Sequence, residues 1–128
     1  MKKAADRAER IQKTLKRTYP AVKTQLLHDT PFQLLVATIL SAQCTDRQVN
    51  TVTRRLFSAL KTPSDFAAAD SAALEEMIRP TGYFRNKARN IQRCAAALIE
   101  RHGGRVPETL EALVALPGVG RKTANVVL

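Results

Sequence analysis

The chain has 128 residues, of which 45% are hydrophobic, and its 21 lysines and arginines outnumber its 11 aspartates and glutamates to give a net charge of +10 at pH 7. This length corresponds to one ordinary domain with a hydrophobic core rather than two. The charge indicates a polyanionic partner, and the longest apolar run, residues 34–40 apart from Thr38, is too short for a membrane span, which needs about 20 residues.

The cations are concentrated in two segments. Residues 1–27 carry eight cations and two anions, and residues 79–105 carry seven cations and one anion. The first ten residues include acidic side chains and lead to no apolar segment, so we expect no secretion signal and a cytoplasmic location. Cys44 and Cys94 lack further cysteines or histidines at metal-ligand spacing, so we predict reduced thiols and no metal site in this chain.

Residues 3–18 predict a first helix with one narrow apolar stripe among cations, ended by Tyr19 and Pro20. Such a short basic helix must dock on something to be stable, and the alternative is a solvated basic arm. A linker over residues 28–31 follows, with Asp29 or Thr30 as a helix cap. Residues 32–41 are apolar on nearly all faces, which predicts a central helix surrounded by others.

The next segments predict a series of amphipathic helices. One is capped by Thr45 or Asp46, a short one covers residues 62–69, and the next is capped by Ser71 and stopped by Pro80. A longer helix follows the turn at Gly82 and stops at residues 103–104. Its expected buried residues are Ile91, Cys94, Ala95, Leu98 and Ile99. Because no strand-type alternation appears, the predicted fold class is all-α, a compact bundle of short helices.

Cations crowd the first turns of that longer helix, against the preference of the helix dipole. They are Arg85, Lys87, Arg89 and Arg93. A run of cations at this end indicates phosphates nearby, and ordinary exposed surface charge is the alternative.

The last segment joins a tight turn to a helix. Thr109 caps a helix that leads into LPGVGRKTANVVL, residues 116–128, in which Gly118 and Gly120 flank Val119. Glycine reaches positive φ without a Cβ penalty, so this pattern predicts a hairpin between two helices. The free N–H groups of the second helix, with Arg121 and Lys122, suit a phosphate. A non-catalytic hairpin that only holds phosphate is the alternative.

This segment closely resembles the helix-hairpin-helix of the endonuclease III family of DNA base-excision glycosylases, and the resemblance extends from about Pro31 onward. It implies the DNA-glycosylase fold, with Lys122 as the catalytic nucleophile. Burial and the positive helix end would favour the neutral amine that this role requires. Residues 41–46, SAQCTD, are similar to the family's SAQxTD, in which the glutamine, here Gln43, enters the void left by the extruded base.

The residue after Gly82 is implied to contact the base left unpaired, which gives Tyr83 a stacking role. On residue type alone, Gln43 is a solvated helix-end residue, and Tyr83 with Phe84 anchors a turn in the core. The resemblance adds hairpin residues to the predicted DNA-binding set. That set is Gln43, Tyr83, Arg85, Lys87, Gly118, Val119, Gly120, Arg121 and Thr123.

The function implied is base-excision repair, in which an N-glycosylase removes oxidised pyrimidines and an associated lyase cuts the abasic site. The expected partner is double-stranded DNA with a damaged base or an abasic site, bound by a nucleoid-associated monomer. A non-enzymatic helix-hairpin-helix DNA-binding module is one alternative. A helical interaction domain whose basic patches serve solubility is another.

The chain ends at Leu128 inside an apolar helix, which we interpret as truncation. Residues 1–27 are then a basic N-terminal helix and linker that would pack on a missing cluster domain, and residues 28–128 are the glycosylase domain. The family's second catalytic group, an aspartate, and its [4Fe–4S] cluster are expected in the full-length protein. We therefore expect the 128 residues alone to turn over poorly.

Overall fold

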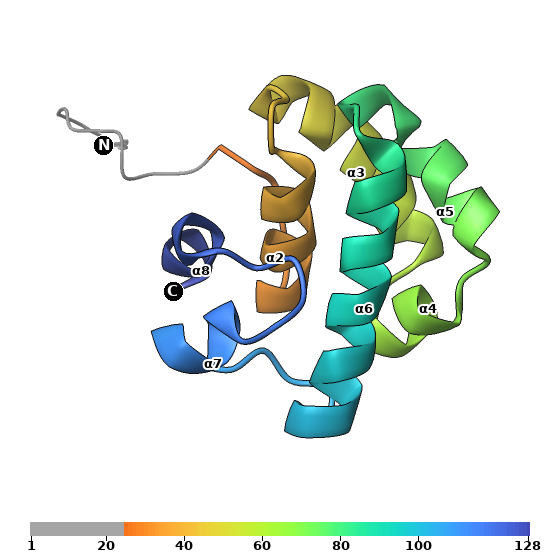
Figure 1. Ribbon diagram of the computed structural model, residues 1–128. Coiled ribbons are helices and arrows are strands. Elements are labelled where there is room, and N and C mark those ends of the chain that lie inside the picture. The colour runs from red at the N-terminus through yellow and green to blue at the C-terminus, as the bar shows by residue number, and fades with distance from the viewer. Residues whose placement is uncertain (1–24) are drawn as a thin grey trace, which may run out of the picture.

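The computed structural model describes residues 25–128, and every regular element within that range is helical. The predicted all-α class is confirmed. Helices α2 (Pro31–Leu40) and α6 (Phe84–His102) lie next to each other at the centre, with the remaining helices around them (Figure 1). The helix predicted over residues 3–18 and nearly all of the predicted unit 1–27 lie outside the described residues.

Helix α2 is enclosed by its neighbours, as its sequence predicted. Thr30 is its cap, because the Thr30 hydroxyl accepts a hydrogen bond from the Gln33 backbone N–H at 3.1 Å. Every residue from Phe32 to Leu40 is buried. Burying one leucine side chain contributes about 1.5–3 kcal/mol, so this one helix supplies a large part of the core.

Helix α3 (Asp46–Ala59) packs on α2, whereas α4 (Pro63–Ala68) and α5 (Ser71–Ile78) pack on α6. The predicted Ser71 cap of α5 is wrong. Asp70 is the cap, since its carboxylate accepts a hydrogen bond from the Ala73 N–H at 3.0 Å. The Ser71 hydroxyl instead donates to the Gln92 side chain of α6 at 2.8 Å, a tertiary contact that the local sequence does not reveal.

A 3₁₀ turn, η2 (Arg79–Thr81), leads into α6. Helix α6 ends as predicted at Gly103, which has φ 62°, and the Gly104 N–H donates to the Leu98 carbonyl at 2.9 Å. The predicted buried stripe is confirmed except at Ile99, which is 40% exposed. Ile99 lies at the edge of the stripe, where the neighbouring helices no longer cover it.

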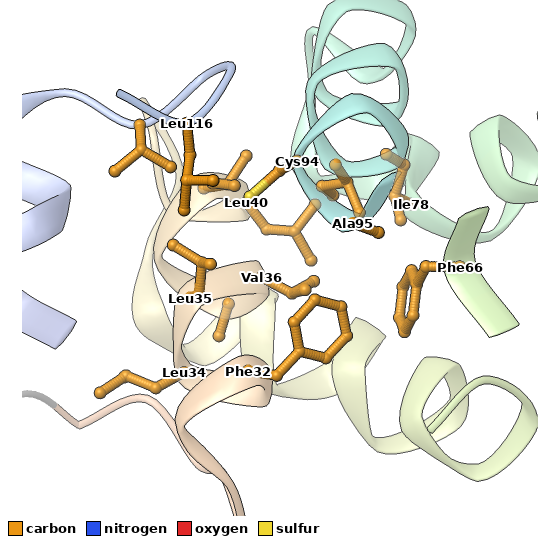
Figure 2. Packing of buried hydrophobic residues seen from close by; sticks show 14 of the residues in the cluster. Phe32, Leu34, Leu35, Val36, Leu40, Phe66, Ile78, Cys94, Ala95 and Leu116 are labelled. Atoms are coloured by element: carbon orange, nitrogen blue, oxygen red, sulfur yellow. The ribbon is translucent and has the colours of Figure 1, made fainter. Parts of the chain in front are cut away.

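The core joins these helices through large side chains. The Phe32 and Phe66 rings meet edge to face, with centroids 5.3 Å apart. This arrangement stabilises the fold by about 0.5–1.5 kcal/mol beyond the contribution of the apolar area that the rings bury. Figure 2 shows these rings facing each other within a cluster that also contains Leu40 and Leu116. Because Leu116 belongs to the C-terminal hairpin, the core also holds the hairpin in place.

The hairpin consists of α7 (Leu110–Val114), a turn, and α8 (Arg121–Val127). Gly118 has φ 77°, and the buried Val119 donates its N–H to the Leu116 carbonyl at 3.2 Å. A Cβ atom at Gly118 would lie 2.6 Å from the Cβ of Asn90 on α6. The turn therefore touches α6 at a point where only glycine fits.

We predict that Gly118→Ala destabilises the chain by about 2–4 kcal/mol, because the left-handed conformation costs about 1–2 kcal/mol and the contact with Asn90 adds an overpacking cost of about 1–3 kcal/mol. The control is Gly120→Ala, where φ is −90° and no atom lies within 4 Å of the new methyl group. That change should shift the free energy of unfolding by less than about 1 kcal/mol. Urea unfolding of both variants measures the difference, and equal effects would contradict the assigned contact.

Candidate nucleic-acid interface

A cavity of about 330 Å³ lies where the end of α2, the start of α6 and the hairpin meet. Five residues of the predicted site line it: Gln43, Tyr83, Lys87, Gly118 and Thr123. A larger cavity of about 580 Å³ lies near the start of α2 and along α3, and none of the predicted residues lines it. The smaller cavity is therefore the candidate site, since it collects residues from three separate segments.

Two of these residues share an uncommon backbone conformation. Gln43 has φ 54° and Tyr83 has φ 48°, and no other non-glycine residue within residues 25–128 has positive φ. Such a conformation costs about 1–3 kcal/mol for a non-glycine residue and tends to occur at functional sites. Both side chains are exposed, Tyr83 to 66%. Tyr83 is therefore not the core anchor of its turn, whereas its neighbour Phe84 is half-buried.

Lys87 occupies a different environment from the one the cation cluster predicted. The residue is only 4% exposed, and its Nζ donates hydrogen bonds to the carbonyls of Leu40 and Thr81, each at 2.8 Å. Burial lowers the pKa of Lys87, and the nearby Cys44 opposes part of that effect. A side chain in this position does not reach a phosphate on the surface, so the expected direct contact has no support from its geometry.

The other predicted cations of α6 are on the surface. Arg85, Arg89 and Arg93 are exposed, and the Arg85 guanidinium lies 5.7 Å from the centre of the Phe84 ring. Within the described range the single ion pair joins Arg79 and Glu76, at 3.3 Å. The exposed arginines of α6 are therefore not neutralised by described acidic residues, and this leaves them able to contact phosphates.

The start of α8 carries Arg121 and Lys122, both exposed. Gly120 is the cap residue and supplies no side-chain hydrogen bond, so the first N–H groups of α8 have no side-chain partner there. The burial expected for Lys122 is not found, because Ala124 is the residue of α8 that faces the core. Lys122 also does not line the cavity, although its neighbour Thr123 does.

Sequence reasoning missed three polar residues that line the cavity: Thr38, Asn86 and Asn90. The two asparagines lie four residues apart and therefore on one face of α6. Asn86 lies three residues after Tyr83, and Asn90 lies three residues after Lys87. Helical periodicity counted from these two predicted site residues is therefore a signal in the sequence that identifies both asparagines. Thr38 lies within the apolar run of α2 and gives no such signal.

The described residues do not fit the iron–sulfur cluster that the family resemblance implies. Four thiolates are needed, and the two cysteines here are Cys44, half-buried, and Cys94, fully buried. Burial raises the pKa of Cys94 to about 11, which makes it a poor ligand. In residues 25–128 no group of three or more potential ligands is close enough to hold a metal ion. Over the same range, no helix is long and apolar enough to cross a membrane.

Comparison with known proteins places this geometry in context. Endonuclease III of Synechocystis sp. is 52% identical over 122 residues, which are 95% of this chain and 56% of that protein. Two solved structures match with a TM-score of 0.81 and 54% identity over 84% of this chain. One is described as a non-covalent endonuclease III–DNA complex and the other as a trapped endonuclease III–DNA covalent intermediate. The chain spans about half the length of these relatives.

A family model, described as HhH-GPD superfamily base excision DNA repair protein, matches residues 36–127. This match runs from within the buried central helix, through the turns that carry Gln43 and Tyr83, to the last residue of α8. It therefore includes every element that lines the candidate site. With most of its length matched in this way, the chain belongs to the HhH-GPD superfamily of base excision DNA repair proteins.

Proposed function

We propose that the protein containing this chain removes oxidised pyrimidines from double-stranded DNA and cleaves the resulting abasic site, as a DNA glycosylase with lyase activity. The observation that carries the proposal is the cavity of about 330 Å³, where Gln43, Tyr83 and the hairpin glycine Gly118 meet beside the start of α8. The endonuclease III relatives support the same reaction class. The substrate implied is a duplex with a damaged or missing base.

Phosphate contacts position the duplex in this proposal. The start of α8, where the Gly120 cap supplies no side-chain hydrogen bond, presents backbone N–H groups beside the hairpin turn, with Arg121 alongside. The exposed Arg85 and Arg89 of α6 extend the basic surface. These contacts read the DNA backbone rather than base edges, so binding is tolerant of sequence and sensitive to salt.

A base inside a duplex is unreachable, so the nucleotide must rotate out of the stack and leave a gap. Gln43 and Tyr83 are exposed, line the same cavity and share a left-handed backbone conformation. We assign them to the gap, with the Tyr83 ring available to stack on a neighbouring base. Thr123, also in the cavity wall, lies toward the extruded nucleotide in this arrangement.

Lys122 performs the chemistry in this proposal. Its neutral Nζ attacks the anomeric carbon of the sugar, so that a C–N bond forms as the bond to the base breaks and the base departs with the electron pair. The attacking nitrogen loses a proton to the departing base, and the C1′–O4′ bond then breaks, with O4′ taking a proton from water, to leave a C1′=N iminium. Loss of the C2′ proton to water forms the C2′=C3′ double bond and expels the 3′ phosphate, which cuts the strand. Only the neutral amine is a nucleophile, so the reaction needs the water around Nζ to be displaced when DNA binds.

Other features of the whole protein follow as proposals. The cluster implied by the resemblance would be held by residues that this chain does not contain, and no step above is derived through it. In this proposal residues 1–27 form a separate N-terminal unit and residues 28–128 form the glycosylase domain. A monomer that acts on the chromosome, in the cytoplasm and associated with the nucleoid, suits the proposed substrate.

A non-enzymatic DNA-binding module is the second candidate function. The observation in its favour is that Lys122 is exposed and lies outside the cavity wall. A non-enzymatic module would make the same phosphate contacts but would form no covalent bond to DNA. Covalent capture of DNA therefore distinguishes the two functions.

Covalent capture of DNA tests the proposed chemistry. In the longest form that the gene encodes, incubation with an abasic-site duplex and borohydride should reduce the iminium to a stable crosslink, and Lys122→Gln should abolish it because no amine remains at that position. Lys61→Gln is the control, since Lys61 is exposed but lies in the wall of the other cavity. Peptide mass mapping locates the adduct. Equal crosslinking by Lys122→Gln, or an adduct on another lysine, would favour the non-enzymatic module.

The salt dependence of binding tests the proposed phosphate contacts. The logarithm of the affinity for an abasic-site duplex should fall linearly with the logarithm of salt concentration, and Arg89→Gln should make that slope shallower by about 0.9 because one phosphate contact is lost. Lys61→Gln should leave the slope unchanged. Fluorescence anisotropy over a range of salt concentrations measures both. A flat dependence in the unaltered chain would instead support a helical interaction domain without a nucleic-acid partner.

A further inference from the structure

The proposed function leaves one charged side chain of the cavity wall without a role. Lys87 is 4% exposed, and its ammonium group donates to two backbone carbonyls at 2.8 Å. Burying a charge is unfavourable unless its hydrogen bonds are satisfied, so a lysine kept here indicates that these bonds have a use. Exposed arginines on the same helix already supply positive charge to the surface.

The two carbonyls belong to different segments of the chain. Leu40 is the last residue of α2, three residues before Gln43, and Thr81 is the last residue of η2, two residues before Tyr83. The bonds from Lys87 span 47 and 6 residues of sequence. One ammonium group therefore ties together the two turns that carry the non-glycine residues of positive φ.

The two carbonyls, at the ends of α2 and η2, suit a lysine ammonium group. A carbonyl at the end of a helix has no partner within that helix, and the negative end of the helix dipole attracts a cation. An ammonium group has three donors directed tetrahedrally, so it can reach two carbonyls from separate segments at once. Thr81 is itself buried, and its hydroxyl donates to the Ile78 carbonyl at 2.7 Å, which fixes the η2 end of the bridge.

We propose that Lys87 is a positioning residue that holds the turns of Gln43 and Tyr83 at a fixed separation, so that both side chains enter the gap in the duplex from the same side. The inference rests on the proposed function, because it takes these two residues as the gap fillers. Lys87 touches neither DNA nor the reacting atoms in this arrangement. Its contribution is to discrimination between damaged and intact DNA, not to general affinity.

The test uses two duplexes, one intact and one with a tetrahydrofuran abasic-site analogue opposite 2-aminopurine. Lys87→Met keeps an unbranched side chain one atom shorter than lysine and removes both hydrogen bonds. It should lower the ratio of abasic to intact affinity about tenfold and reduce the 2-aminopurine fluorescence change, with the salt slope unaltered. Arg89→Met, the matched control on the surface of the same helix, should make the slope shallower by about 0.9 on both duplexes and keep the ratio.

A mutant cycle separates positioning from a general loss of structure. In the unaltered background, the double change Gln43→Ala with Tyr83→Ala should lower the affinity ratio at least tenfold, whereas in the Lys87→Met background it should lower it by no more than about twofold. Equal reductions in both backgrounds would overturn the proposal. A shallower salt slope for Lys87→Met would also overturn it, because that result requires direct phosphate contact.

Lysine acetylation of the unaltered chain gives a second test that needs no variant. Lys87 should remain unlabelled under conditions that label Lys61 and Lys122, and DNA should protect Lys122 without changing Lys87. Rapid labelling of Lys87 in the absence of DNA, with protection by DNA, would overturn the proposal even if Lys87→Met does not fold.

If the unaltered chain binds both duplexes equally, the proposed function fails and the inference fails with it. If the unaltered chain discriminates and folded Lys87→Met discriminates equally well, only the inference fails.

Discussion

The enclosure of α2 by other helices is the constraint on which the rest of the structure depends. Because every residue from Phe32 to Leu40 is buried, α3, α6 and α8 must all pack against the same ten-residue rod. The hairpin is added to this core through Leu116 and through the contact between Gly118 and Asn90. The candidate site is consequently built where three segments converge at the end of α2.

The polar groups at that end are arranged around one buried charge. The last carbonyl of α2, that of Leu40, has no partner within its helix, and the Lys87 ammonium satisfies it together with the Thr81 carbonyl of η2. On either side of this bridge the backbone enters the left-handed region, at Gln43 and at Tyr83. A strained conformation persists only where surrounding contacts hold it, and the buried hydrogen bonds are contacts of that kind.

The cations of α6 lie in two environments, with Lys87 buried and the arginines on the surface. The arginines of α6 are exposed and have no ion-pair partner among residues 25–128, where the one ion pair joins Arg79 of η2 to Glu76 of α5. Exposed guanidinium groups without ion-pair partners attract a polyanion at long range. The candidate cavity, in contrast, is lined mainly by neutral amides and hydroxyls. Long-range attraction and local recognition are therefore carried by different residues, with Lys87 belonging to neither class.

Within residues 25–128 the sequence by itself determined the all-helical class, the caps Thr30, Thr45 and Thr109, and the hairpin, because these depend on local patterns. Continuous apolar residues identified α2, Thr109 identified the start of α7, and residues 117–120 identified the turn. Other features were decided only by tertiary structure. Asp70 rather than Ser71 caps α5, while the serine hydroxyl donates to Gln92 of α6. Ala124 is the residue of α8 that faces the core, and Lys122 is exposed. Lys87 resembled its neighbours Arg85 and Arg89 in sequence, yet it alone of the three is buried, since only its position on α6 faces the carbonyls of Leu40 and Thr81. Periodicity gives the face of a helix, whereas the partners that a side chain meets there come from segments distant in sequence.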